Sequence, residues 1–219
     1  LAFEIERQHG EPDLQPARLT VDLYRMPDFS AVEVTTTRVR DGRRIRVVDA
    51  EFVSGGVGVG RASCQLLRRS ETPSADVWTR DNWDVAPPDD IEPPSDPGEG
   101  LGGMWATRAI NGKMGTAGPR RVWISEVREL VGGCDLTPWQ RVALAADFTS
   151  PFANSGVEGL GFINTDITLY LQRLPRTQWI GFEVVNHQST EGVANGECYL
   201  YDETGPIGSS TVAALAQRR

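Results

Sequence analysis

The sequence predicts an α+β fold built from two tandem units, each with a long helix wrapped by an antiparallel sheet. Two observations predict it. The two ends of the chain repeat each other over about fifty residues without a gap, which indicates a duplicated supersecondary unit. Each copy also alternates apolar and polar residues in short segments separated by turn signals, as half-buried antiparallel strands do.

The repeat is clearest where one strand of each copy ends in Arg-x-Pro. Leu19-Thr-Val-Asp-Leu-Tyr-Arg25-Met-Pro27 matches Ile167-Thr-Leu-Tyr-Leu-Gln-Arg173-Leu-Pro175, an offset of 148 residues. The same offset places Gly60 on Gly208, Ser63 on Thr211 and Val59 on Ile207. We therefore expect equivalent strands in the two copies.

The first copy reads as the end of a helix followed by an antiparallel meander. The first seven residues have the pattern of a helix whose beginning is missing from the sequence. Asp41-Gly42 and Ser54-Gly55-Gly56 are strong turn signals. The strands predicted around them cover residues 17–25, 32–39, 44–53 and 57–67.

The second copy contains the more complete unit. A strand is predicted within 120–130, where Val122, Ile124 and, less regularly, Val127 recur in alternation. Thr137-Pro138 is a good N-cap and first-turn pair for a helix that ends at Asp147. The strands expected after it cover residues 166–172, 178–186, 193–201 and 207–215.

An acidic segment rich in Pro and Gly separates the copies. We predict an N-terminal unit at 1–70, with its start apparently missing, a linker at 71–103 and a C-terminal unit at 104–219. Residues 71–100 hold nine acids and one base, which account for the whole net charge of −8. Because the rest is neutral overall, nucleic acid is disfavoured as a partner. Trp78, Trp83 and Trp105 predict that aromatic anchors hold the linker to the body.

Composition excludes several other classes of protein. The chain has 219 residues, of which 39 % are hydrophobic and 24 % charged, as in ordinary globular proteins. The run at 142–146 is far too short to span a bilayer, and no targeting peptide is visible, so we expect no membrane partner. Cys64, Cys134 and Cys198 lack paired spacing, which predicts buried thiols and a cytoplasmic location.

Other motifs carry little specific signal. Gly56-Val-Gly58-Val-Gly60 lacks the third glycine of a dinucleotide site and is read as a hairpin turn. No G-x-S-x-G nucleophile elbow occurs, and His9 and His187 fit neither a catalytic pair nor a zinc site. We interpret His187 as an exposed polar residue. The run at 43–46 (Arg-Arg-Ile-Arg) could hold a phosphate, although a solvated strand face is the favoured reading.

Three segments of the second copy resemble the type II acyl-CoA thioesterase family and its thioesterase-like relatives. They are Pro138-Trp-Gln-Arg-Val-Ala-Leu-Ala-Ala-Asp147-Phe, Phe162-Ile-Asn-Thr-Asp166-Ile-Thr-Leu-Tyr-Leu-Gln-Arg173 and Gly208-Ser-Ser-Thr211. The resemblance implies a double hotdog fold over most of the chain outside the linker.

The resemblance also implies a site in which an Asp, a hydroxyl residue and a Gln orient the attacking water. The Asp falls on Asp147, the hydroxyl position on Asn164 with Thr165 beside it, and the Gln position near Ala213. Thus one member is kept, one is changed in type and one is absent. The competing reading is that Asp147 caps the following loop and that Asn164 is a turn residue.

The sequence leaves three functions open. The first is hydrolysis of a fatty acyl-CoA thioester by water that Asp147 activates, with Asn164 and Thr165 assisting and with no metal or organic cofactor. The second is a non-catalytic acyl or acyl-CoA binding protein that has lost part of the trio, and a weaker third is a hotdog dehydratase. The chain could be a monomer or a homo-oligomer that pairs through sheet edges.

Overall fold

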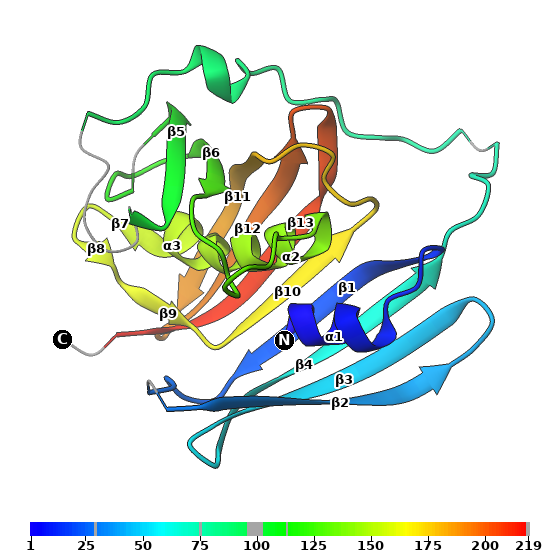
Figure 1. Cartoon of the computed structure of the whole chain (residues 1–219). Coiled ribbons are helices and arrows are strands. Elements are labelled where there is room, and N and C mark those ends of the chain that lie inside the picture. The colour runs from blue at the N-terminus through cyan, green and yellow to red at the C-terminus, as the bar shows by residue number, and fades with distance from the viewer. Residues whose placement is uncertain (29, 75, 96–102, 113, 218–219) are drawn as a thin grey trace.

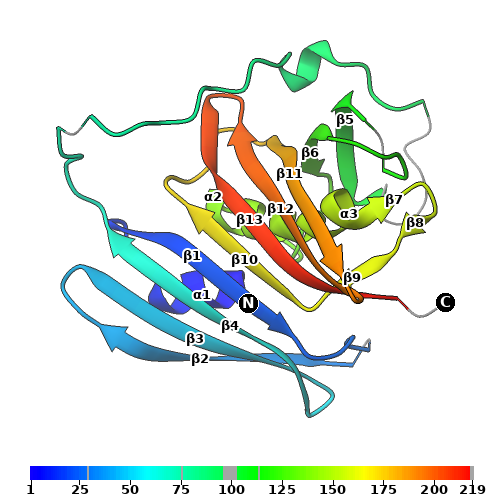
Figure 2. The ribbon, with the colours of Figure 1, turned by 180° about the vertical axis from the view of Figure 1, so that it is seen from behind.

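The computed structural model describes residues 1–28, 30–74, 76–95, 103–112 and 114–217. Its dominant feature is an 11-stranded antiparallel sheet with the strand order β2-β3-β4-β1-β10-β13-β12-β11-β6-β5, and β9 pairs with β13. The helices lie on one face of this sheet, in front of the strands in Figure 1 and behind them in Figure 2. The sheet therefore has one covered face and one outer face.

The first part of the chain forms a helix and four antiparallel strands, as predicted, but the strands are not a simple meander. Because β1 pairs with β4, their order is β2-β3-β4-β1, and the second part repeats it as β11-β12-β13-β10. The elements are α1 (Ala2–His9), β1 (Leu14–Leu23), β2 (Val32–Asp41), β3 (Ile45–Ser54) and β4 (Val57–Arg68). The β3–β4 turn uses Gly55 and Gly56, both with positive φ, which glycine adopts without steric cost. The predicted turn signal is thus confirmed.

The second part contains every predicted element and several short ones that were not predicted. Its main elements are β6 (Arg121–Glu126), α2 (Pro138–Ala145), β10 (Asp166–Leu171), β11 (Ile180–Thr190), β12 (Val193–Asp202) and β13 (Gly205–Ala216). The predicted helix continues beyond α2 through the 3-10 turn η3 (Ala146–Phe148) into α3 (Thr149–Asn154). The elements without a sequence prediction are β5 (Trp105–Asn111), β7 (Ser155–Gly156), β8 (Gly159–Leu160) and β9 (Phe162–Asn164).

The start of α2 is fixed by side-chain capping. Thr137 and Gln140 form a reciprocal capping box, and Pro138 occupies the first turn. Glu6 of α1 accepts hydrogen bonds from Thr137 Oγ1 at 2.7 Å and Gln140 Nε2 at 2.6 Å. The cap therefore also ties the two helices together.

The two parts of the sheet join through β1 and β10. Thr20 lies directly opposite Thr168, and their hydroxyl oxygens are 3.3 Å apart. On either side of this junction the registers correspond, since Leu23 pairs with Gly60 and Leu171 with Gly208. At both glycines an added Cβ would collide with a carbonyl oxygen of the neighbouring strand, so both positions need the missing side chain.

The core lies between the helices and the covered face of the sheet. Its fully buried side chains come from both parts of the chain and include Val48, Ile124, Val142, Ile180 and Leu200. Cys64 and Cys198 are also completely buried, which confirms the predicted apolar thiols, whereas Cys134 is only half-buried. Burial raises the pKa of the Cys64 thiol to about 12.

The described residues of the predicted linker, 71–74, 76–95 and 103, run along the upper edge of the molecule in Figure 1. Trp83 stacks on Tyr201 with ring centroids 4.4 Å apart and meets Trp123 edge-on, so it is an anchor as predicted. Trp105 is buried against Phe148, but the prediction for Trp78 is wrong, because it is 85 % exposed. A 3-10 turn, η1 (Pro88–Asp90), forms where no regular structure was expected, and residues 96–102 lie outside the described residues.

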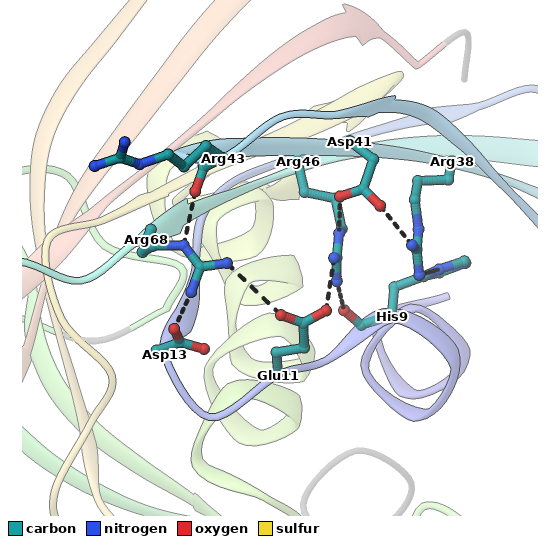
Figure 3. A network of polar contacts seen from close by, with 8 residues as sticks. All are labelled: His9, Glu11, Asp13, Arg38, Asp41, Arg43, Arg46 and Arg68. Carbon is teal, nitrogen blue, oxygen red and sulfur yellow. Dashed lines mark hydrogen bonds and ion pairs between the residues drawn. The ribbon is translucent and has the colours of Figure 1, made fainter.

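A network of charged side chains joins α1 to the β2–β3 hairpin (Figure 3). Arg46 is 5 % exposed and donates to Asp41 Oδ1, Glu11 Oε1 and the carbonyl oxygen of His9 at 2.6–2.9 Å. The favoured reading of the run at 43–46 as a solvated face is therefore wrong for Arg46, since this side chain turns inward. Arg43 and Arg44 are exposed as expected.

We expect Arg46→Met to lower the free energy of unfolding by about 1–3 kcal/mol, because three hydrogen bonds from a buried cation are lost. Urea unfolding monitored by circular dichroism measures the change. Arg44→Met is the matched control on the same hairpin and should stay within about 0.5 kcal/mol of the parent. Equal effects of the two substitutions would contradict the assigned role of Arg46.

An ion pair between Asp202 and Arg173 stabilises the β12–β13 turn. Asp202 has a fully buried side chain and receives two hydrogen bonds from Arg173, at 2.6 and 2.7 Å. Burial alone would raise the pKa of this carboxyl, but Arg173 and the backbone N–H groups of Arg176 and Thr204 outweigh it and lower the pKa to about 2.

The lowered pKa of Asp202 predicts that the protein loses stability in acid. A carboxyl whose pKa is lowered on folding stabilises the protein above its ordinary pKa of 3.8, and this stabilisation disappears as the pH falls through about 2. Asp202→Asn should therefore cost about 2 kcal/mol at pH 6, and the difference should shrink between pH 4 and pH 2. Urea unfolding across this range checks it, with the exposed Asp135→Asn as control. A difference that does not vary with pH would disprove the linkage.

Candidate active site

The candidate site is centred on Asp147, in the 3-10 turn between α2 and α3. Val142, Ala145 and Ala146 are buried just before it, so the apolar face of the helix fixes the position of the turn. Asp147 as a whole residue is exposed, yet protein atoms crowd its carboxyl. This desolvation raises the pKa of the carboxyl, and a hydrogen bond from Asn164 partly offsets the effect.

Asn164 reaches Asp147 from the sheet. It ends β9, where it lies opposite Ala214 of β13, and its Nδ2 is 3.5 Å from Asp147 Oδ1. This distance is at the long end of a hydrogen bond. The structure therefore brings together two of the three predicted site residues, from elements 17 positions apart in the sequence.

Thr165 has a different set of contacts. Its Oγ1 and its backbone N–H both donate to the carbonyl oxygen of Ala213, at 3.3 and 2.9 Å. The backbone N–H of Ala213 in turn donates to Asp166 Oδ1 at 2.6 Å. Thr165 and Asp166 thus hold the β13 backbone beside the site, and the Thr165 hydroxyl has no described contact with Asp147.

The residue that faces Asn164 from β13 is Ala214, which is 3 % exposed, rather than Ala213, which is exposed. Successive residues of a strand point to opposite faces. The Gln position expected near Ala213 therefore holds an alanine whichever face of β13 is considered. Neither alanine side chain can hydrogen-bond to a water molecule.

This arrangement suits acid–base chemistry on a water molecule. A carboxylate with a raised pKa can accept a proton, and the Asn164 amide can both donate and accept hydrogen bonds. Among the described residues, no three His, Cys, Asp or Glu side chains gather closely enough to hold a metal ion.

A cavity of about 350 Å³ lies between the end of α3, the β7–β8 segment and β11. Phe162, which precedes Asn164 by two residues on β9, lines it together with Asn154 and His187. Neither Asp147 nor Asn164 is among the residues that line it, although Phe162 and Asn164 share a face of β9 about 7 Å apart.

His187 is the polar residue that sequence reasoning misjudged. It is half-buried, and its Nδ1 donates to Asn154 Oδ1 at 3.0 Å. The two residues are 33 positions apart and lie on a strand and at the end of a helix. No local pattern links such residues, so only the packing of α3 on β11 could have revealed the pair.

Comparison with known families assigns the chain. Residues 1–69 match the acyl-CoA thioesterase N-terminal domain, and residues 84–215 match the acyl-CoA thioesterase C-terminal domain. The chain belongs to the acyl-CoA thioesterase family. The resemblance seen in the sequence is thereby confirmed, and the protein is a thioester hydrolase in the general sense of that family.

Solved structures similar to this thioesterase share its fold. Acyl-CoA thioesterase II TesB2 from Mycobacterium marinum is 17 % identical with a TM-score of 0.73, over 100 % of this chain and 86 % of that one. A conserved protein with a hot dog fold from Alicyclobacillus acidocaldarius is 16 % identical with a TM-score of 0.75, over 100 % and 84 %. A thioesterase described as putative, from Novosphingobium aromaticivorans, is 19 % identical with a TM-score of 0.73, over 94 % and 81 %.

These likenesses establish the hotdog fold of the thioesterase. A comparison with curated proteins finds no match. In the described part of the chain, no helix is both long and apolar enough to cross a membrane.

The raised pKa of Asp147 predicts that its negative charge destabilises the folded thioesterase. A carboxyl whose pKa rises on folding is penalised above its folded pKa, and the penalty vanishes below the ordinary value of 3.8. Asp147→Asn should therefore be at least as stable as the parent at pH 7, with the difference closing toward pH 3.5. Thermal unfolding at both pH values tests this. A variant that is clearly less stable at pH 7 would favour the loop-capping role.

Proposed function

We propose that this thioesterase hydrolyses fatty acyl-CoA thioesters with water activated by Asp147. The observation that carries the proposal is the desolvated Asp147 carboxyl with the Asn164 amide 3.5 Å away. Desolvation makes the carboxylate a stronger base than a free Asp, which suits it to accept a proton from water as the thioester is attacked.

Asn164 has two parts in this proposal. Its Nδ2 donates to Asp147 and keeps the carboxylate oriented, and its Oδ1 is left to accept a hydrogen bond from the attacking water. Thr165 assists indirectly, since its bonds to Ala213 fix the backbone from which Asn164 projects. A full hydroxyl–glutamine pair is not needed if the amide performs both tasks.

We also propose that the fold is a tandem double hotdog, with units at 1–70 and 104–219 and a linker at 71–103. Three features support it: the offset of 148 residues, the junction of Thr20 with Thr168, and the matching glycine contacts at Gly60 and Gly208. The edge strands β2 and β5 are the places where a second copy could pair.

The alternative function is acyl-CoA binding without hydrolysis. Asn164 and Ala214 favour it, because an amide and a methyl group stand near the places where the resemblance implies a hydroxyl and a glutamine. Release of free thiol from acyl-CoA separates the two functions, since a binding protein would release none above the uncatalysed rate.

The decisive measurement is thiol release from octanoyl-CoA by the parent and by Asp147→Asn. We expect the substitution to lower kcat/KM by about 10²-fold or more, because the general base is lost. In the parent, the acid limb of kcat/KM should fall at a pH above 3.8, since activity requires the carboxylate and its pKa is raised.

Asp135→Asn, an exposed acid in the loop before α2, is the control and should keep full activity. Undiminished hydrolysis by Asp147→Asn would overturn the proposed mechanism. Absence of hydrolysis by the parent, with retained acyl-CoA binding, would establish the alternative.

A further inference from the structure

The His187–Asn154 pair is a second polar centre on the covered face of the sheet. An amide oxygen can only accept, so His187 must carry its proton on Nδ1. On its other side the amide contacts Ser150, since Asn154 Nδ2 donates to Ser150 Oγ at 3.3 Å. In the neutral ring Nε2 is therefore a hydrogen-bond acceptor, and it has no partner among the described residues.

The surrounding fold holds this pair in place. Asn154 is 4 % exposed at the end of α3, and Arg120 donates to the carbonyl oxygens of Phe152 and Ser155 on either side of it. Gly196 lies opposite His187 on β12, and a Cβ at Gly196 would come within 2.7 Å of Asn154 Oδ1. A glycine is thus required for the amide to sit against the sheet.

Two cavities meet at His187. One, of about 350 Å³, lies along β7, β8 and Phe162, and the other, of about 340 Å³, lies along Arg120 and Val184. Both are also lined by Ala153 and Ser155. The imidazole is therefore an accessible polar group between two small, partly apolar spaces.

Neither space is lined by Asp147 or Asn164, but β9 links the larger one to the proposed reacting centre, because it carries both Phe162 and Asn164. The Phe162 ring is 5.4 Å from the imidazole, and Phe162 shares a face of β9 with Asn164, about 7 Å away. A thioester held at Asp147 and Asn164 can thus extend one of its substituents along β9 to His187.

We propose that His187, oriented by Asn154, is a specificity-determining residue that accepts a hydrogen bond from a donor group on one substituent of the thioester. The donor is a hydroxyl on the acyl chain or an amide N–H of the thiol arm. This inference rests on the proposed function, because Asp147 defines where the thioester lies. The acceptor favours substrates that carry the donor at the right distance, since an unpaired polar group in the cavity is unfavourable.

The test for a hydroxyl on the acyl chain compares octanoyl-CoA with 3-, 5- and 7-hydroxyoctanoyl-CoA. Dissociation constants come from calorimetry in the Asp147→Asn background, and kcat/KM from thiol release by the parent. We expect one hydroxy isomer to be preferred by about fivefold to tenfold, and His187→Phe, which keeps a ring but lacks the acceptor, to abolish the preference.

The test for the thiol arm compares S-octanoyl-N-acetylcysteamine, which keeps an amide, with S-ethyl octanethioate, which lacks it. A preference for the amide that His187→Phe removes would assign the donor to the thiol arm. His187→Gln, which retains an acceptor, should recover part of either preference and guards against simple loss of packing. Gln188→Leu, at the exposed next position of β11, is the matched control and should change neither ratio.

The outcomes are separable from those of the proposed function. If His187→Phe changes no ratio in either test, the inference is wrong even when Asp147→Asn abolishes hydrolysis. If the parent hydrolyses none of these probes but the calorimetric preference depends on His187, the proposed hydrolysis fails and the specificity role stands.

Discussion

The pairing of β1 with β10 is the constraint on which the rest of the structure depends. It joins the two groups of strands into one sheet, and its register places Thr20 opposite Thr168. A slip of one residue would turn Leu19 and Leu169, both buried, to the outer face. The same register brings the helices onto one face, where Glu6 of α1 can meet the cap of α2.

Most of the sheet could be predicted because its information is local. Alternation and turn signals define β3 and β4, and the offset between the copies then indicates β12 and β13. The elements that were missed depend on partners distant in the sequence. The strand β5 exists only through its pairing with β6, and β7 and β8 form a hairpin of two residues each. The prediction for Trp78 failed for the same reason, since aromatic character alone does not show whether the folded protein has a surface against which the ring can pack.

In the candidate site, too, local patterns predict the positions of the residues, whereas the contacts between them depend on segments distant in the sequence. Asp147 follows from the end of a patterned helix, and Asn164 from its place before a patterned strand. Which side chains meet is decided by strand parity, so Ala214 and not Ala213 faces Asn164, and Thr165 bonds to backbone. The His187–Asn154 hydrogen bond depends on Gly196, because a side chain at this position would collide with the Asn154 amide. A glycine inside a strand does not show from the sequence which residue packs against it.

The charges of this protein show how a desolvated carboxylate can be tolerated. Asp202 and Arg46 are buried, but each has oppositely charged partners that favour the charged form and hence the folded state. From the described residues Asp147 receives only a long hydrogen bond from a neutral amide, so its charged form is disfavoured by folding. A cation placed beside it would stabilise the protein but would lower the pKa and weaken the base. The absence of a described ion pair at Asp147 therefore separates this carboxylate chemically from those that stabilise the fold. The free energy that the desolvated charge costs must be offset by interactions elsewhere in the protein.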